Sequence, residues 1–157
     1  MPAREFVVGV ISDTHGLLRP AALDVLRGSD MIIHAGDAGK PEVIERLGEV
    51  APLHVVRGNV DKGSWAAALP VTELVEVGEH RFFVLHDISQ LDVDPEAAGF
   101  AAVVFGHSHR PSIERRGGVL FLNPGSAGPR RFKLPVTVAR VKTSGRRMRA
   151  DIVELHV

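Results

Sequence analysis

Residues 6–16 read FVVGVISDTHG, an unbroken apolar run that ends in two potential metal ligands and a glycine. The run predicts a strand over residues 6–11 that is buried on both faces, as in a parallel sheet. Asp13 and His15 follow it, and they point to the same side if the extended backbone continues for two more residues. Taken alone, this pair fits a turn with a capping aspartate as well as it fits a metal site.

Downstream of this stretch, helix and strand patterns alternate. A helix over residues 20–26 opens at a proline and precedes an apolar run over residues 31–34. A second helix starts at Pro41 and precedes another apolar run, over residues 53–56. This β-α-β-α-β order predicts parallel strands joined by right-handed crossovers.

The second half of the chain has the pattern of antiparallel hairpins around one more buried strand, residues 102–105. Glycine-containing turns separate three pairs of strands: 72–77 with 81–86, 112–116 with 119–123, and 135–142 with 148–155. We therefore expect an α/β fold in which two packed mixed β-sheets are flanked by helices, a four-layer α-β-β-α sandwich. Because the chain has no internal repeat and no long linker, we expect residues 1–157 to form a single domain.

The composition narrows the class of partner and of metal site. Lys plus Arg and Asp plus Glu number 19 each, so no global field favours nucleic acid, and we read the basic run 146–149 as a solvated face. The chain has no cysteine, so a metal ion must be held by His, Asp, Glu or Asn. With no apolar leader and no run long enough to span a membrane, we expect a cytoplasmic protein without a membrane partner. Whether it forms homo-oligomers stays open.

Four further segments place polar donors after apolar runs: Asp37, Asn59, His86, and the pair His107 and His109. Each has a plain alternative, because Gly-Asp and Gly-Asn are common turns and a lone histidine is often structural. Together with Asp13 and His15 they make seven N or O donors at five strand ends. The carboxyl ends of strands in open α/β sheets converge on the ligand crevice, so the full set predicts a metal site.

The ordered motifs resemble those of the calcineurin-like metallophosphoesterase family, in particular its compact bacterial and archaeal phosphodiesterase branch. The matching segments are residues 13–16, 36–37, 58–61, 86, 106–109 and 123–126. The resemblance implies that two divalent metal ions bind, and for this mixed donor set we expect Mn²⁺, with Fe, Ni or Zn as alternatives. It also implies the ligands: Asp13, His15 and His109 for one ion, Asn59, His86 and His107 for the other, and Asp37 as the bridge.

The resemblance further implies a dinuclear phosphoesterase, and we expect a phosphodiesterase that uses a metal-bridging hydroxide as its nucleophile. Asp37, Asn59 and His86 are the expected catalytic residues, and the substrate is a small phosphoester or phosphodiester. The alternative is a non-catalytic binding scaffold of the same fold, such as a eukaryotic protein-sorting subunit whose site is impaired. This chain keeps all seven donors, which favours the enzyme.

The chain departs from the family pattern at two positions. Val60 stands where phosphoprotein phosphatases have a histidine that protonates the leaving group, so we expect slow turnover or a preference for good leaving groups. Asp87 replaces a common glycine and either orients a ligand histidine or caps the next turn. The segment 88–99 is too short for a cap domain, and the resulting open cleft favours a diester.

Overall fold

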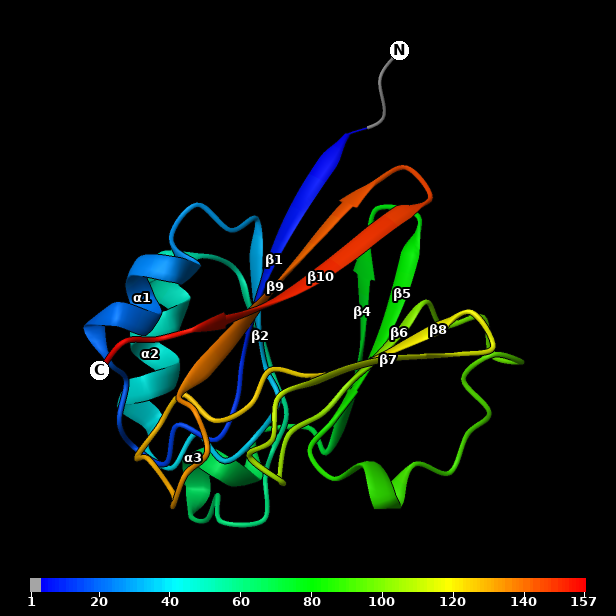
Figure 1. Cartoon of the computed structure of the whole chain (residues 1–157). Helices are drawn as coiled ribbons and strands as arrows, with labels where there is room; N and C mark the ends of the chain where they lie inside the picture. Colours follow the sequence, from blue (N-terminus) through cyan, green and yellow to red (C-terminus); the bar gives the residue numbers. More distant parts are fainter. Residues whose placement is uncertain (1–3) are drawn as a thin grey trace.

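The structure, a computed structural model, describes residues 4–157, in which two five-stranded sheets pack face to face (Figure 1). The strand order of the first sheet is β10 (Arg147–Glu154), β9 (Thr137–Ser144), β1 (Glu5–Ile11), β2 (Met31–His34) and β3 (Leu53–Val55). The order of the second is β4 (Thr72–Val77), β5 (His80–Leu85), β6 (Ala102–Val104), β8 (Val119–Asn123) and β7 (Ser112–Arg116). The expected α/β fold of two mixed sheets is confirmed.

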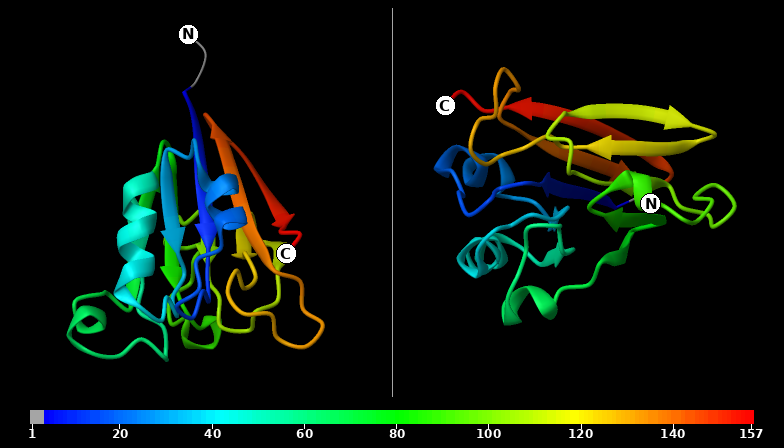
Figure 2. Two further views of the ribbon diagram at one scale, coloured as in Figure 1. Left: turned by 90° about the vertical axis from the view of Figure 1, so that its left-hand side faces the viewer. Right: turned by 90° about the horizontal axis from the view of Figure 1, so that it is seen from below.

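The β-α-β-α-β unit forms as the sequence predicts. Strand β1 pairs in parallel with β2, and β2 pairs in parallel with β3. The crossovers contain α1 (Pro20–Leu26) and α2 (Pro41–Val50). Each helix begins with a proline at its first position, where the missing N–H has no intrahelical partner to lose. Both helices lie against the outer face of the first sheet (Figure 2).

Three details differ from the sequence-based expectation. The second sheet is not built from hairpins alone, because β5, β6 and β8 run parallel to one another. A short helix, α3 (Ser64–Ala67), was not predicted, since a single turn leaves no periodic pattern. The β9–β10 turn is shorter than expected, residues 145–146 rather than 143–147, because Thr143 is buried and continues the strand, and Gly145 takes the positive φ of the turn.

The outer face of the second sheet is covered without a long helix. A 3₁₀ turn, η1 (Ile88–Gln90), and the segment after it lie over this face. Ile88 and Leu91 pack there on Leu85, Val103 and Phe121. The helical layer on this side is therefore reduced to one turn, which leaves the adjacent edge of the sheets uncapped.

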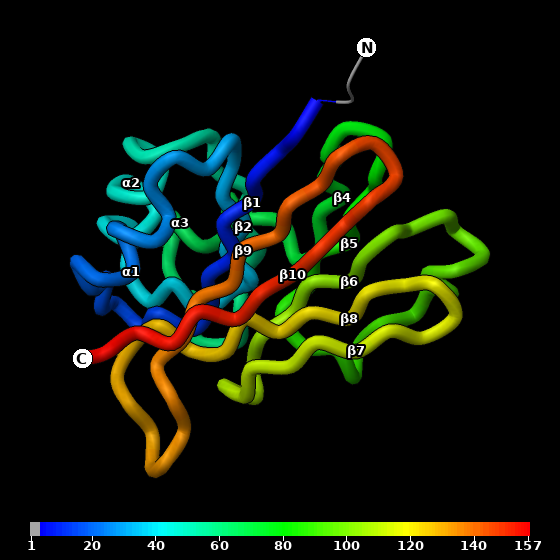
Figure 3. Tube along the Cα trace, turned by 45° about the horizontal axis from the view of Figure 1, so that its top comes forward, coloured from blue at the N-terminus to red at the C-terminus, as the bar shows by residue number. Residues whose placement is uncertain are grey.

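The main core fills the space between the sheets, where Val8, Val10 and Ile33 of the first sheet meet Phe82 and Val104 of the second. Figure 3 shows β9 and β10 beside β1. Strands β1 and β2 run parallel, as do β5 and β6, and all four end on the lower side of the molecule in Figure 1. The loops that follow these strands therefore meet at one edge, as the sequence predicts.

The expectation of a cytoplasmic protein rests in part on the N-terminal residues. Of these, residues 1–3 lie outside the described residues. Among residues 4–157, no helix is long and apolar enough to cross a membrane.

Candidate metal centre

Two groups of side chains at this edge have the geometry of metal sites. In each group the ligand atoms all lie within 4.8 Å of one another: Asp13, His15 and His109 in one group, and Asp37, His86 and His107 in the other. The groups adjoin, because His86 Nε2 lies 3.1 Å from Asp37 Oδ2 and 3.8 Å from Asp13 Oδ1. His15 Nε2 is 3.8 Å from the same Asp37 oxygen. Asp37 thus faces both groups.

Asn59 completes the set of predicted ligands. Its Oδ1 atom is 3.2 Å from His107 Nδ1, on the side of the second group. On the other side, His15 Nε2 and His109 Nε2 approach to 3.3 Å. The structure therefore brings all seven predicted side chains together from five separate loops.

The backbone at these residues is strained. Among residues 4–157, six non-glycine residues have a positive φ, and five of them are the candidate ligands: Asp13, His15, Asp37, His107 and His109, with φ between 47° and 72°. The left-handed conformation costs an L-residue about 1–3 kcal/mol and persists only where the surroundings impose it, typically at functional sites. The strain turns successive side chains toward one point.

Gly36 shows how closely these loops approach. Its φ is +103°, and a Cβ atom added there would lie 2.6 Å from Nδ1 of His86. Any side chain at this position would push the His86 ring out of the group. The glycine of the Gly-Asp motif is therefore required both for the turn and for the neighbouring ligand.

The hydrogen bonds leave metal-binding atoms free. Asp13 Oδ2 accepts from Ser12 Oγ at 2.6 Å and from the His107 N–H at 3.1 Å. His86 Nδ1 lies 2.7 Å from Ala35 O, so Nδ1 carries the proton and donates it to that carbonyl. Asp13 Oδ1 and His86 Nε2 are buried and have no hydrogen-bond partner. Buried orphaned acceptors are costly, and a bound cation satisfies both, so the donor set fits a divalent metal ion.

Electrostatics keep the carboxylates ionised. Burial raises the pKa of Asp13, but its interactions with His109, His15 and Ser12 outweigh burial and hold that pKa well below its usual range. Burial also raises the pKa of Asp37, and contacts from His86 and the Val60 N–H lower it overall. In turn, burial lowers the pKa of His86, but Asp37 and Asp13 raise it overall. The site is an anionic cavity that attracts positive charge.

Asp61 ties together the loops that carry Asp37 and Asn59. Its carboxylate accepts from the N–H groups of Asp37 at 3.0 Å, Gly58 at 2.9 Å and Gly39 at 2.9 Å. Asp61 itself is buried. The motif at residues 58–61 predicts that Asp61 supports Asn59 or its loop. The contacts with Asp37 and Gly39 were not predicted, because they join loops that are separate in the chain.

His34, which is fully buried, also connects the loops that carry the ligands. Burial lowers its pKa to about 4, so the imidazole is neutral. His34 Nδ1 accepts from the Gly36 N–H, and Nε2 lies 3.0 Å from Thr14 Oγ1, which donates onward to Ala38 O. No sequence pattern predicts this contact, since a histidine inside an apolar strand is interpreted as structural.

The loop that carries the two C-terminal histidines is held by Asn123. Its Nδ2 group donates to Gly106 O and to Ser108 Oγ, both at 3.1 Å. Ser126 Oγ, three residues further on, donates to Asp13 O at 3.0 Å. The Asn-Pro-Gly-Ser motif thus positions ligands without belonging to either group.

Of the two roles that the sequence left open for Asp87, the structure shows the cap of the next turn. Its Oδ1 atom accepts from the Ser89 N–H at 3.0 Å and caps η1, while Oδ2 lies 4.0 Å from His107 Nε2. Three arginines near the motifs, Arg57, Arg110 and Arg130, form no ion pair with a carboxylate in the described part of the chain.

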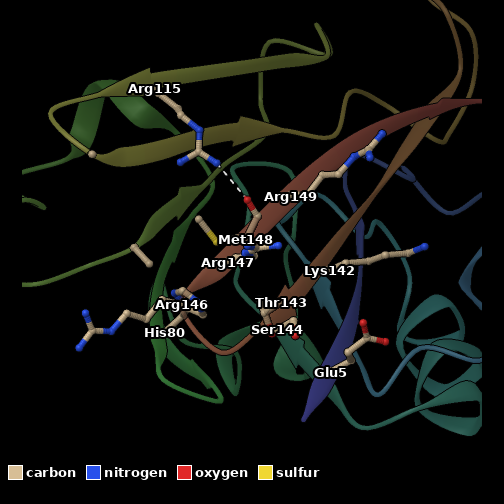
Figure 4. Close-up of a pocket in the computed structure, with 12 residues that line it drawn as sticks. Glu5, His80, Arg115, Lys142, Thr143, Ser144, Arg146, Arg147, Met148 and Arg149 are labelled. Carbon is tan, nitrogen blue, oxygen red and sulfur yellow. Dashed lines mark hydrogen bonds between the residues drawn. The ribbon is translucent and has the colours of Figure 1, made fainter. Parts of the chain in front are cut away.

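A hollow larger than the one beside the metal-ligand groups lies elsewhere in the described residues. It has a volume of ≈790 Å³ and lies at the opposite ends of the strands (Figure 4). There Arg115 donates to Met148 O at 3.1 Å, and further basic side chains fan outward. Neither metal-ligand group borders it. The chemistry of the donors, rather than the size of a cavity, identifies the candidate centre.

Comparison with known proteins decides the family. Residues 6–146 match the model of the calcineurin-like phosphoesterase superfamily domain. The chain belongs to this family. A probable metallophosphoesterase of Methanothermobacter thermautotrophicus is 30% identical over 94% of this chain and 91% of its own length.

Solved structures agree with the fold of the family. A predicted phosphoesterase of Streptococcus pneumoniae TIGR4 has 29% identity and a TM-score of 0.75, over 96% of this chain and 90% of its own. An archaeal phosphodiesterase has 23% identity and a TM-score of 0.75, over 94% and 99%. Vacuolar Protein Sorting 29 of Cryptosporidium parvum has 18% identity and a TM-score of 0.78, over 98% and 99%. At these low identities the last two show a shared fold.

Proposed function

We propose that this metallophosphoesterase is a dinuclear phosphodiesterase. The observation that carries the proposal is the convergence of seven donors in two adjoining groups, with Asp37 facing both. Asp13, His15 and His109 would hold one ion, and Asn59, His86 and His107 the other, with Asp37 as the shared ligand. Mn²⁺ is the proposed ion, since imidazole, carboxylate and amide oxygen suit it.

Two such ions would supply a water of lowered pKa as the nucleophile and would offset the negative charge that grows on the phosphate oxygens. Hydrogen bonds within the chain orient the ligand side chains. The bond from His86 Nδ1 to Ala35 O fixes the ring and leaves Nε2 facing the centre. The carboxylate of Asp61 holds the Asp37 and Gly58 backbones in register, so that the shared ligand and Asn59 keep their positions.

The surroundings of the centre favour diesters with good leaving groups. Val60 follows Asn59 and is 43% exposed, and its side chain has no proton to give to a departing alkoxide. The short segment over the second sheet leaves this edge open, so that a substrate with two alcohol groups has room. The similarity to an archaeal phosphodiesterase supports the same choice.

The second candidate is a binding scaffold, which the likeness to Vacuolar Protein Sorting 29 raises. Five strained ligand positions and two orphaned buried acceptors argue for a working metal site instead.

The test is to load the purified protein separately with Mn, Fe, Ni and Zn, to measure the metal content, and to assay matched mono- and diesters of p-nitrophenol. We expect two ions per chain and a higher kcat/KM for the diester. Clear preference for the monoester would refute the phosphodiesterase assignment. A chain that binds two ions and hydrolyses neither ester would support the scaffold.

A further inference from the structure

A second hollow opens directly beside the candidate metal centre. Its volume is ≈380 Å³, within the range of about 300–1,000 Å³ that is typical of small-molecule sites. Asn59 and His86 belong to its wall as well as to the metal-ligand set. A substrate whose phosphate lies between the ligand groups would therefore extend one of its alcohol groups into this hollow.

The rest of the wall combines polar and apolar side chains. Beyond the ligands it includes Arg57, Thr72, Asp87, Gln90 and Asp92, with Val71 and Leu85 as the apolar part. In residues 4–157, the side chains of Arg57, Gln90 and Asp92 form no hydrogen bond or ion pair with the protein. Their donors and acceptors are available to a ligand.

The charges of the wall restrict the ligand. Asp87 and Asp92 outnumber the single cation, Arg57, so the hollow disfavours a second phosphate or a carboxylate. Carboxylates do accept hydrogen bonds from hydroxyl groups, as an acidic residue does from a ribose hydroxyl in dinucleotide-binding folds. Gln90 adds one acceptor and two donors. A neutral group with several hydroxyls matches these polar side chains.

We propose that this hollow binds a sugar-like alcohol with vicinal hydroxyls, such as a ribonucleoside, as one of the two ester groups of the substrate. Asp87 and Asp92 accept from the hydroxyls, and Arg57 belongs to the same wall. The inference rests on the proposed phosphodiesterase function, and it narrows the substrate class to phosphodiesters of ribose-like alcohols.

A binding measurement tests it without turnover. The protein loaded with Mn²⁺ is titrated in a calorimeter with adenosine 5′-monophosphate and with its 2′-deoxy analogue. These ligands share phosphate and base and differ by one hydroxyl. A hydrogen bond to a charged group contributes about 1.5–3 kcal/mol, so the ribonucleotide is expected to bind at least about tenfold more tightly. Equal affinity of the two nucleotides would overturn the proposal.

Variants test which side chains cause the difference in affinity between the two nucleotides. In the double variant Asp87→Asn with Asp92→Asn, the affinity ratio is expected to fall toward one, because the charged acceptors are lost while side-chain size is kept. Losses shared by both nucleotides cancel in this ratio. Asp24→Asn, the same change on an exposed face of α1, is the matched control and keeps the ratio. If the double variant keeps the affinity ratio of the wild type, the 2′-hydroxyl does not bind Asp87 or Asp92, and the assignment of these residues is refuted.

The same pair of nucleotides, as their p-nitrophenyl diesters, separates this inference from the proposed function. Both release the same leaving group, so kcat/KM reports the other alcohol. If neither diester is hydrolysed but the affinity ratio is present, the phosphodiesterase proposal fails and the binding site stands. If both diesters are hydrolysed at equal rates and both nucleotides bind equally, the phosphodiesterase proposal is supported and the proposed ribose site is refuted.

Discussion

Replacing Asp61 by alanine tests whether one buried carboxylate organises the loops of the centre. Asp61 belongs to neither ligand group, yet it accepts three backbone N–H groups at 2.9–3.0 Å. The donors of Asp37 and Gly58 are buried, and that of Gly39 is partly buried. Alanine leaves these donors with no acceptor.

The expected loss follows from the number of donors. An unsatisfied buried donor costs about 1–3 kcal/mol, and two such donors make about 2–6 kcal/mol. The third donor, the Gly39 N–H, can reach water, and the loops around Asp61 relax in part. We therefore expect the free energy of unfolding to fall by about 3–5 kcal/mol. Domains are typically stable by about 5–15 kcal/mol, so the variant is expected to fold but to be clearly weakened.

The assay is urea unfolding of metal-free protein, followed by calorimetric titration with Mn²⁺. With an m-value of about 2 kcal/mol/M, the midpoint drops by roughly 2 M. Metal affinity is expected to fall about 10–100-fold, the usual effect of removing a partner that holds a ligand in place. Asp61→Asn, which keeps one acceptor oxygen, is expected to lie between the wild type and alanine.

Asp24→Ala is the control, because its carboxylate pairs with Arg27 on the exposed surface of α1 and contributes little. If Asp61→Ala unfolds within about 0.5 kcal/mol of the wild type, as surface substitutions do, and binds Mn²⁺ unchanged, the bracing role of Asp61 is refuted.

Three other predictions concern the ligands, the metal and pH. Asp37→Ala is expected to reduce metal content at both ion sites together, because a shared ligand cannot be lost from only one; elemental analysis showing one ion fully retained would contradict its bridging role. Chelation with EDTA is expected to lower Tm by roughly 5–10 °C relative to protein with Mn²⁺ at about 100 times Kd, from the linkage of binding to folding; an unchanged Tm would show that no ion stabilises the fold. His34 has a folded-state pKa of about 4, below its unfolded value of 6.5, so metal-free protein loses up to about 3 kcal/mol as the pH falls from 6.5 to 4. This loss is expected to be absent in His34→Asn, so equal pH slopes for the two proteins in urea unfolding would refute it.

The sequence predicted the features that depend on short-range patterns. Apolar runs followed by Asp13, Asp37 or Asn59 mark strand ends, and both prolines mark helix starts, because burial and φ restriction act locally. The convergence of the ligands was also predictable, because the carboxyl ends of strands in open α/β sheets meet at the ligand crevice. Their division between two ions came from the family resemblance, since spacing alone carries no such information.

Other features depend on contacts between distant segments. The parallel pairing of β5 with β6 and β8 is set by the packing of the sheets, which no local pattern encodes. The hydrogen bonds of Asp61 span 22 and 24 residues to Gly39 and Asp37. The hollow beside the centre combines Arg57, Thr72 and Asp92 from three segments. Such sites become visible only when the whole fold is known.

The central claim is that seven side chains from five loops hold two cations. Anomalous diffraction from crystals grown with Mn²⁺ tests it most directly. The account predicts two peaks about 3.5–4 Å apart, both within bonding distance of Asp37, with His109 at one and His107 at the other. A map with no peak among these side chains, or with His107 and His109 turned away from Asp13 and Asp37, would contradict it.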